Sequence, residues 1–109
     1  MPILPKSPNL QDFQKYVQEL EIERGFTGNS VLQNSLQLGE EIGELFKAIR
    51  KAENFKIDHN SQFGQIGEEM ADIFIFLCSI ANRYQIDLEE EFRKKEEVNK
   101  TRTWEKNQK

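Results

Sequence analysis

The chain has 109 residues, 37% of them hydrophobic and 31% charged, which is the size of one ordinary domain, so we expect residues 1–109 to form a single domain. The formal net charge of −4, with no dominant basic patch, argues against a nucleic-acid polymer as a partner. The single cysteine excludes an internal disulfide, and the longest apolar run, residues 70–81, is too short to span a bilayer, so we expect a cytoplasmic protein without a membrane partner.

Helix start signals mark most of the expected elements, and no segment alternates apolar and polar residues as a strand would. Asn9 can cap a first helix, and Ser30 with Gln33 forms a capping-box pattern that opens a second. Asp87 with Glu90 forms the same pattern at the start of a fourth helix. The expected helices span roughly residues 9–24, 30–53, 65–84 and 87–102.

The third expected helix is apolar nearly all round from Met70 to Ala81. A helix that is apolar on every side must be surrounded by other elements. Four helices joined by short turns predict an all-α, antiparallel four-helix bundle-like domain. In a monomer of this size the neighbouring helices would leave part of the third helix uncovered, so we expect a homo-oligomer, either a dimer or a tetramer.

Two pairs of carboxylates border the apolar stripes of the second and third helices. Glu41 and Glu44 lie three residues apart in one, and Glu69 and Asp72 repeat this spacing in the other. Residues at i and i+3 share a helix face, so antiparallel packing would bring the four side chains together. Two such charges about 4 Å apart repel by roughly 4 kcal/mol at an effective dielectric near 20. Either the carboxylates point apart on solvated faces, or a cation holds them together.

A set of ligands made only of oxygen suits a hard cation, Mg²⁺ or Mn²⁺, rather than zinc. A di-iron carboxylate bundle would require Glu-x-x-His elements. The chain has one histidine, His59, and the residue three positions before it is Lys56. The residues by themselves therefore leave two interpretations open, a pair of solvated helix faces or a site for a hard cation.

Two segments, EEIGELFKAIRK (residues 40–51) and GEEMADIFIFL (residues 67–77), resemble the MazG-like nucleotide pyrophosphohydrolases of the all-α NTP pyrophosphatase superfamily. The hallmark of that family is E-x-x-E on one helix and E-x-x-D on the next, which the four carboxylates match. The segment KKEEVNKTRTW (residues 94–104) is similar to the final helix of the family. The resemblance covers Leu10 to Trp104.

The resemblance implies an enzyme that converts a nucleoside or deoxynucleoside triphosphate and water into the monophosphate and pyrophosphate. It further implies Mg²⁺ held by the four carboxylates, with Mn²⁺ as a substitute, and a role in housecleaning of the nucleotide pool. Glu40 and Glu68, each next to an expected ligand, are candidates for the base that activates water. We favour Glu40 as the catalytic residue because the family commonly has a doubled glutamate there. The base and sugar of the substrate stay open.

Three polar residues near the end of the chain complete the expected site. Lys95, Asn99 and Arg102 fall at i, i+4 and i+7 and share one face if the fourth helix continues that far. The resemblance implies that they bind the phosphates, and the alternative is a solvated basic tail. Trp104 could stack on a base or cover the core.

A non-catalytic helical module is the alternative from another class of protein. Such a module would use the apolar third helix to oligomerise or to bind a partner, and its carboxylates would only flank a groove. The two interpretations differ in their response to Mg²⁺, because an ion stabilises a protein only when it binds the folded state in preference to the unfolded one.

Overall fold

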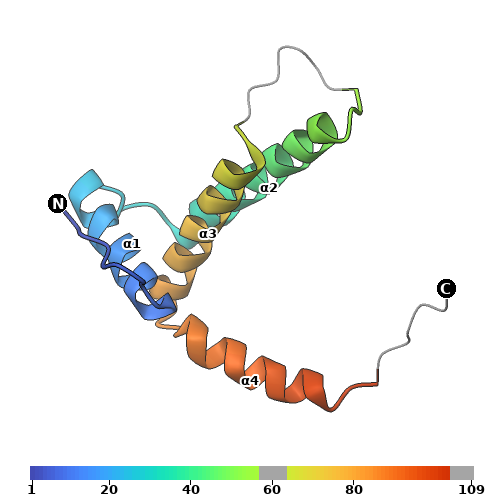
Figure 1. The fold of residues 1–109 in the computed structure, drawn as a ribbon. Coiled ribbons are helices and arrows are strands. Elements are labelled where there is room, and N and C mark those ends of the chain that lie inside the picture. Colours follow the sequence, from blue (N-terminus) through green and yellow to red (C-terminus); the bar gives the residue numbers. More distant parts are fainter. Residues whose placement is uncertain (57–63, 104–109) are drawn as a thin grey trace.

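The computed structural model describes residues 1–56 and 64–103 and contains four α-helices (Figure 1). They are α1 (Leu10–Arg24), α2 (Val31–Ala52), α3 (Ile66–Arg83) and α4 (Leu88–Lys100). The described residues form no β-strand, so the predicted all-α class is confirmed. Each helix begins one residue after its expected start, because the N-cap residue lies outside the hydrogen-bonded helix. None of the helices in this part of the chain has the length and apolar character that a membrane crossing requires.

Side-chain caps fix the starts of α1 and α2 where the sequence predicts them. The Asn9 side chain accepts a hydrogen bond from the Asp12 backbone N–H at 2.8 Å, and the Asn9 N–H donates to the Asp12 carboxylate at 3.0 Å. Ser30 and Gln33 form the same reciprocal pair at 3.1 and 2.7 Å. Each capping box satisfies backbone N–H groups that have no partner inside the helix.

The start of α4 forms half of the predicted capping box. The Asp87 carboxylate accepts a hydrogen bond from the Glu90 N–H at 3.1 Å. The Glu90 carboxylate instead pairs with Lys94 at 3.0 Å, one turn farther along the helix. An ion pair at i and i+4 thus takes the carboxylate that the full capping box would require.

α2 and α3 form an antiparallel pair, and α1 packs against the C-terminal half of α3 (Figure 1). The core lies where α1 meets α3 and is built from Val17, Leu20 and Cys78. At its border the rings of Phe13 and Phe74 meet edge to face with centroids 5.3 Å apart, a favoured aromatic geometry. This core holds one end of α3 in place, and the other end carries the second carboxylate pair.

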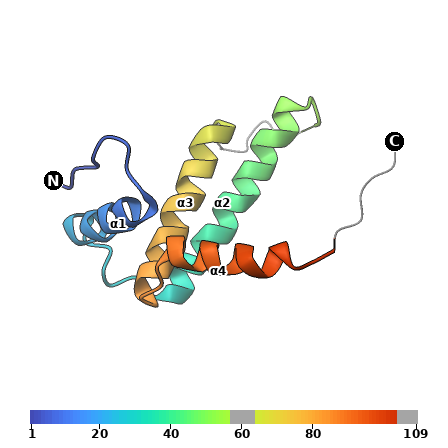
Figure 2. The same ribbon diagram turned by 60° about the horizontal axis from the view of Figure 1, so that its bottom comes forward.

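α4 diverges from the other three helices in Figure 1, and in the view of Figure 2 it crosses in front of α2 and α3. At its start Leu88 packs against the core, but none of the residues of α4 is buried. The side chain of Phe92 is 66% exposed. The bundle-like packing is therefore made by α1, α2 and α3, and α4 presents an apolar side chain that nothing in the described part of the chain covers.

The apolar helix α3 is covered only in part. Met70 is 56% exposed and Leu77 is 44% exposed, and Phe46 on the neighbouring α2 is 59% exposed. Apolar side chains exposed over adjacent helices are unfavourable in water and are typical of surfaces that bind another protein.

A buried glutamine joins α1 to the turn between α3 and α4. The Gln14 side-chain amide donates to Asn82 Oδ1 at 3.1 Å and to the carbonyl of Ile86 at 2.8 Å. Its oxygen accepts a hydrogen bond at 2.9 Å from the backbone N–H of Leu88, the first residue of α4. Asn82 in turn donates to the Gln14 carbonyl at 2.9 Å. These bonds set the position from which α4 departs.

Replacing Gln14 with leucine should lower the free energy of unfolding by about 1–3 kcal/mol, because its partners lose hydrogen bonds in a mostly buried site. Urea denaturation followed by circular dichroism measures the change. The control is Gln18→Leu on the exposed side of α1, which should change stability by less than about 0.5 kcal/mol. Equal losses in both variants would contradict a stabilising role for the Gln14 hydrogen bonds.

Candidate active site

The antiparallel packing of α2 and α3 brings the four predicted carboxylates together. α2 supplies Glu41 and Glu44, and α3 supplies Glu69 and Asp72 close to its start. One carboxylate oxygen from each of Glu41, Glu69 and Asp72 lies within 4.8 Å of the other two. Glu44 interacts with both Glu41 and Glu69. The arrangement predicted from two residue spacings is therefore present as a cluster, and the role of its members as metal ligands stays a prediction.

Glu69 is the most buried member of the cluster, with 3% of its surface exposed. Its Oε1 accepts a hydrogen bond from the backbone N–H of Gly64 at 2.5 Å. A Cβ atom at position 64 would clash with Glu68 Oε2 and lie 2.9 Å from Glu69 Oε1, so a side chain there would displace both carboxylates. The backbone just before α3 thus orients the Glu69 side chain.

Burial and mutual repulsion change the acidity of the cluster. The pKa of Glu41 rises from 4.5 to about 7, first because the side chain is buried and then because the Glu69 carboxylate lies close to it. The negative charges of Glu44 and Asp72 raise it further. The pKa of Glu44 is also raised, mainly by burial, whereas the Gly64 N–H lowers the pKa of Glu69 by stabilising its carboxylate. Without a cation, the cluster therefore retains a proton close to neutral pH.

Two buried oxygen atoms of the cluster, Glu41 Oε2 and Glu69 Oε2, have no hydrogen-bond partner among the described residues. Buried polar atoms are normally paired, and an unpaired carboxylate oxygen is unfavourable. A cation between the helices would satisfy both atoms, and a donor set of carboxylate oxygens suits Mg²⁺ or Mn²⁺. The residues present therefore fit the metal that the sequence predicts.

Glu40 lies exposed beside the cluster, and its side chain makes no hydrogen bond within residues 1–56 and 64–103. Its negative charge raises the pKa of Glu44, although by less than burial and Glu69 do. Glu68 differs, because its carboxylate accepts a hydrogen bond from the Gln65 N–H at 3.4 Å and so helps to begin α3. This contact leaves Glu40 the freer of the two candidate bases, and its catalytic role stays a prediction.

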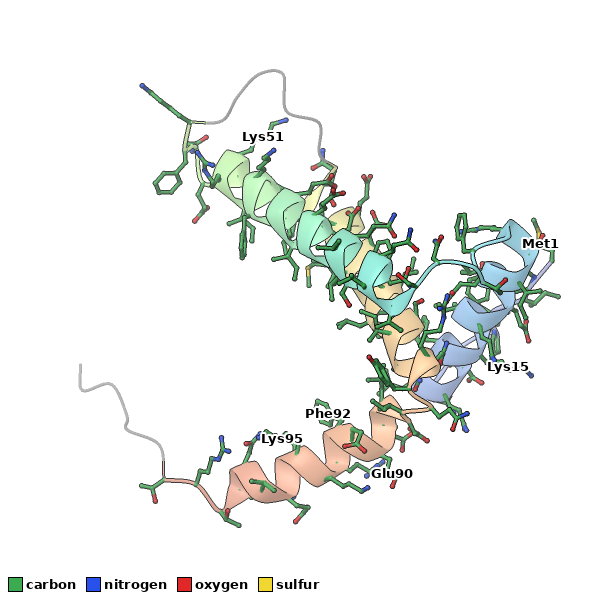
Figure 3. The ribbon with its side chains drawn as sticks, turned by 180° about the vertical axis from the view of Figure 1, so that it is seen from behind. Met1, Lys15, Lys51, Glu90, Phe92 and Lys95 are labelled. Carbon is green, nitrogen blue, oxygen red and sulfur yellow. The ribbon has the colours of Figure 1, made fainter. Side chains whose placement is uncertain are left out.

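Lys95, Asn99 and Arg102 do not meet the carboxylate cluster within one chain. Lys95 and Asn99 lie on α4, which starts beyond the end of α3 that is remote from Glu69, and Arg102 follows that helix (Figure 3). Asn99 donates a hydrogen bond to the Glu96 carboxylate at 3.1 Å. Phosphate binding by these three residues stays a prediction. His59 and Trp104 lie outside the described residues.

A cavity of about 330 Å³ adjoins the cluster and is lined by residues of α1, α2, α3 and the α1–α2 turn. Asp72 of the cluster forms part of its wall, and Val17, Phe26 and Phe76 supply apolar surface. Asn34 also lines the cavity, and sequence reasoning missed it. The available signal was its spacing, because Asn34 lies seven residues before Glu41 and therefore two turns away on the same helix face.

The comparisons with known proteins place the chain among the hydrolases that act on nucleotide phosphoanhydrides. The chain belongs to the MazG nucleotide pyrophosphohydrolase domain family, whose model matches residues 29–104. The predicted membership in this family is confirmed.

Solved structures with the same fold carry the family name. Two crystal structures of iMazG from Vibrio DAT 722 resemble the chain, one with a C-terminal and one with an N-terminal tag. The first has 27% sequence identity and a TM-score of 0.60, and the match covers 85% of this chain and 99% of that one. The second has 26% identity and a TM-score of 0.61, covering 89% and 99%. No curated protein sequence matches the chain.

The raised pKa of Glu41 predicts a specific pH dependence of stability in the metal-free protein. Between about pH 4.5 and pH 7 the native protein holds a proton that the unfolded chain has lost. The stabilisation is fully present below pH 4.5 and disappears as the pH rises through 7. Glu41→Gln lacks this titration. From pH 5 to pH 8 its free energy of unfolding should therefore rise by on the order of 2 kcal/mol relative to that of wild type.

Urea denaturation in EDTA at pH 5 and pH 8 measures this difference. Glu23→Gln, an exposed position near the end of α1, is the control and should follow wild type at both pH values. A Glu41→Gln variant that differs from wild type by the same amount at pH 5 and pH 8 would show that Glu41 has an ordinary pKa.

Proposed function

We propose that the protein is a Mg²⁺-dependent nucleoside triphosphate pyrophosphohydrolase, for which Mn²⁺ can replace Mg²⁺. The observation that carries the proposal is the pair of buried, unpaired carboxylate oxygens of Glu41 and Glu69 within the four-carboxylate cluster. Membership in the MazG family supports it, since members of that family hydrolyse nucleotides. A housecleaning role in the cytoplasm, by a single domain over residues 1–109, is part of the same proposal.

In this proposal Glu41, Glu44, Glu69 and Asp72 hold the metal. When bound, Mg²⁺ supplies positive charge for the phosphate oxygens and for the negative charge that develops at the α-phosphorus. The side chains contribute position, because the core and the Gly64 contact hold α3 and Glu69 in place before substrate arrives. Without the cation, a polyanionic triphosphate would be repelled by the cluster.

Glu40 acts as the base that activates water. The water oxygen forms a bond to the α-phosphorus, and the bond from that phosphorus to the oxygen bridging to the β-phosphate breaks. Pyrophosphate leaves with the electron pair, and the proton of the water passes to the Glu40 carboxylate. The Glu40 side chain is exposed and makes no hydrogen bond within the described residues, so its carboxylate is available for this proton.

The cavity next to Asp72 accommodates the nucleoside. A nucleoside bound in this cavity would lie on the side of the cluster away from the start of α3. Phe26 and Phe76 provide apolar and aromatic surface suited to a base. The triphosphate would then extend from the cavity across the carboxylate cluster.

A second copy of the chain covers the exposed apolar side chains of α2, α3 and α4. Phe46, Met70, Leu77 and Phe92 are each more than 40% exposed, which supports a homodimer or a homotetramer. In Figure 3, Phe92 and Lys95 lie on the side of α4 that is turned toward α2 and α3. A second chain that covers Phe92 would therefore also come close to Lys95. Lys95, Asn99 and Arg102 would bind the phosphates in this assembly.

Incubation with a panel of ribo- and deoxynucleoside triphosphates and Mg²⁺ should release pyrophosphate and the monophosphate. Glu41→Gln and Asp72→Asn should each lower kcat at least about 100-fold, because metal-assisted charge stabilisation is lost. Separation of pyrophosphate from orthophosphate identifies the phosphorus attacked. Orthophosphate as the sole product would contradict attack at the α-phosphorus.

A thermal-unfolding titration with Mg²⁺ separates this enzyme from the alternative helical module. Wild type should gain stability with Mg²⁺ because the ion binds the folded state, and the carboxylate variants should gain little. A folded protein that hydrolyses no nucleotide and whose melting temperature ignores Mg²⁺ would favour the interaction module.

Phe92→Asp should dissociate the oligomer, because it places a charge in a surface that a second chain covers. Sedimentation velocity at micromolar concentration measures the change in mass. Gln18→Asp, which makes the same change in charge on the exposed side of α1, should leave the mass unchanged. A wild-type protein that sediments as a monomer at all concentrations would contradict the proposed assembly.

A further inference from the structure

We propose that Asn34 and Ser79 together form the part of the cavity that contacts the hydrogen-bonding edge of the nucleobase and so determine which base is accepted. The proposal rests on the proposed hydrolysis of nucleotides and adds the residues responsible for base specificity. Both residues line the cavity that Asp72 also lines.

The spacing of these residues places them at a distance from the carboxylate cluster that a bound nucleotide can span. Asn34 precedes Glu41 by seven residues on α2, and Ser79 follows Asp72 by seven residues on α3. Seven residues are almost two turns, so each residue shares a helix face with its carboxylate and lies about 10 Å from it along the helix. Because α2 and α3 are antiparallel, both displacements point the same way. A sugar and a base can span such a distance from phosphates at the cluster.

The hydrogen bonding of the pair leaves groups free for a ligand. Asn34 and Ser79 are each 4% exposed, and the Asn34 amide donates to the Ser79 hydroxyl oxygen at 3.1 Å. Within the described residues, Asn34 Oδ1 accepts no hydrogen bond and the Ser79 hydroxyl donates none. A free acceptor thus lies beside a free donor in the wall of a cavity. The Watson–Crick edge of each base also presents a donor next to an acceptor, but the order differs between bases. Adenine and cytosine donate from the exocyclic amino group and accept at a ring nitrogen, whereas guanine and thymine accept at a carbonyl and donate from a ring N–H.

The other polar residues that line the cavity are less able to distinguish one base from another. Arg24 and Gln37 are exposed, Asn29 is only half-buried, and the Glu21 carboxylate accepts a hydrogen bond from Arg83 at 3.2 Å.

Val17, Phe26 and Phe76 can pack against a base or stack on it, and stacking on aromatic rings tolerates every base because each has a π-face. A site whose buried polar groups must be matched rejects a ligand that leaves them unpaired far more strongly than an apolar pocket does. Discrimination between bases therefore falls to Asn34 and Ser79.

The test is the ratio of kcat/KM values for dATP, dCTP, dGTP and dTTP, measured with Mg²⁺ in wild type, Asn34→Leu and Ser79→Ala. Wild type should prefer some bases at least tenfold, and each variant should reduce that preference by about tenfold, the effect of one buried hydrogen bond. Ser35→Ala is the matched control, since Ser35 is an exposed neighbour on α2 that does not line the cavity, and it should keep the wild-type ratio. The ratio of kcat/KM values does not depend on the fraction of enzyme that is folded, so a loss of stability in Asn34→Leu would not change it. Ser79→Ala removes only one oxygen atom and provides a second, milder variant.

Three outcomes would overturn the proposal. A variant that loses overall activity or stability but keeps the wild-type ratio would show that the pair only packs α2 against α3. A wild-type enzyme that hydrolyses all four substrates equally would show that the cavity does not select a base. Wild type that binds and hydrolyses no triphosphate would overturn the proposed function as well, and this failure appears before any variant is compared.

Discussion

The antiparallel packing of α2 against α3 is the constraint on which the rest of the molecule depends. It forces carboxylates from two helices to within 4.8 Å of one another, an arrangement that opposes the packing that creates it. The helices hold together because the stabilising contacts lie elsewhere along them. The buried hydrogen bond between Asn34 and Ser79 joins α2 to α3 directly, and the core of Val17, Leu20 and Cys78 fixes the same end of α3 against α1.

Because the stabilising contacts lie away from the carboxylates, the cluster can hold side chains whose pKa values differ from their ordinary values. Burial and the repulsion between the carboxylates both favour the neutral form of Glu41 and raise its pKa to about 7. Either a proton or a cation relieves this repulsion. Glu69 follows the opposite course, because the Gly64 N–H already stabilises its charged form. One carboxylate is thus kept charged by the backbone while its neighbour is forced toward the neutral state, so a bound cation would exchange the proton on Glu41 for metal charge.

The features that could be predicted from sequence are those set by residues close together in the chain. The cap at Ser30 and the pairing of Glu41 with Glu44 depend on spacings of three residues, and both can be recognised without knowing the fold. The direction of α4 could not be predicted in this way. It depends on Gln14, which bonds to a turn about seventy residues later in the chain. The Asn34–Ser79 contact was missed for the same reason, because each residue alone is an ordinary polar residue within a helix.

The course of α4 also bears on how a substrate would be held. A base in the cavity would be recognised by residues of α1, α2 and α3 of a single chain, all of them fixed by the same packing that forms the carboxylate cluster. The basic residues that follow Phe92 have no such support, since no residue of α4 is buried. If Lys95 and Arg102 bind phosphate, their geometry must come from contacts between chains. Base recognition would then survive in an isolated monomer, whereas the grip on the phosphates, and with it efficient hydrolysis, would depend on the oligomer.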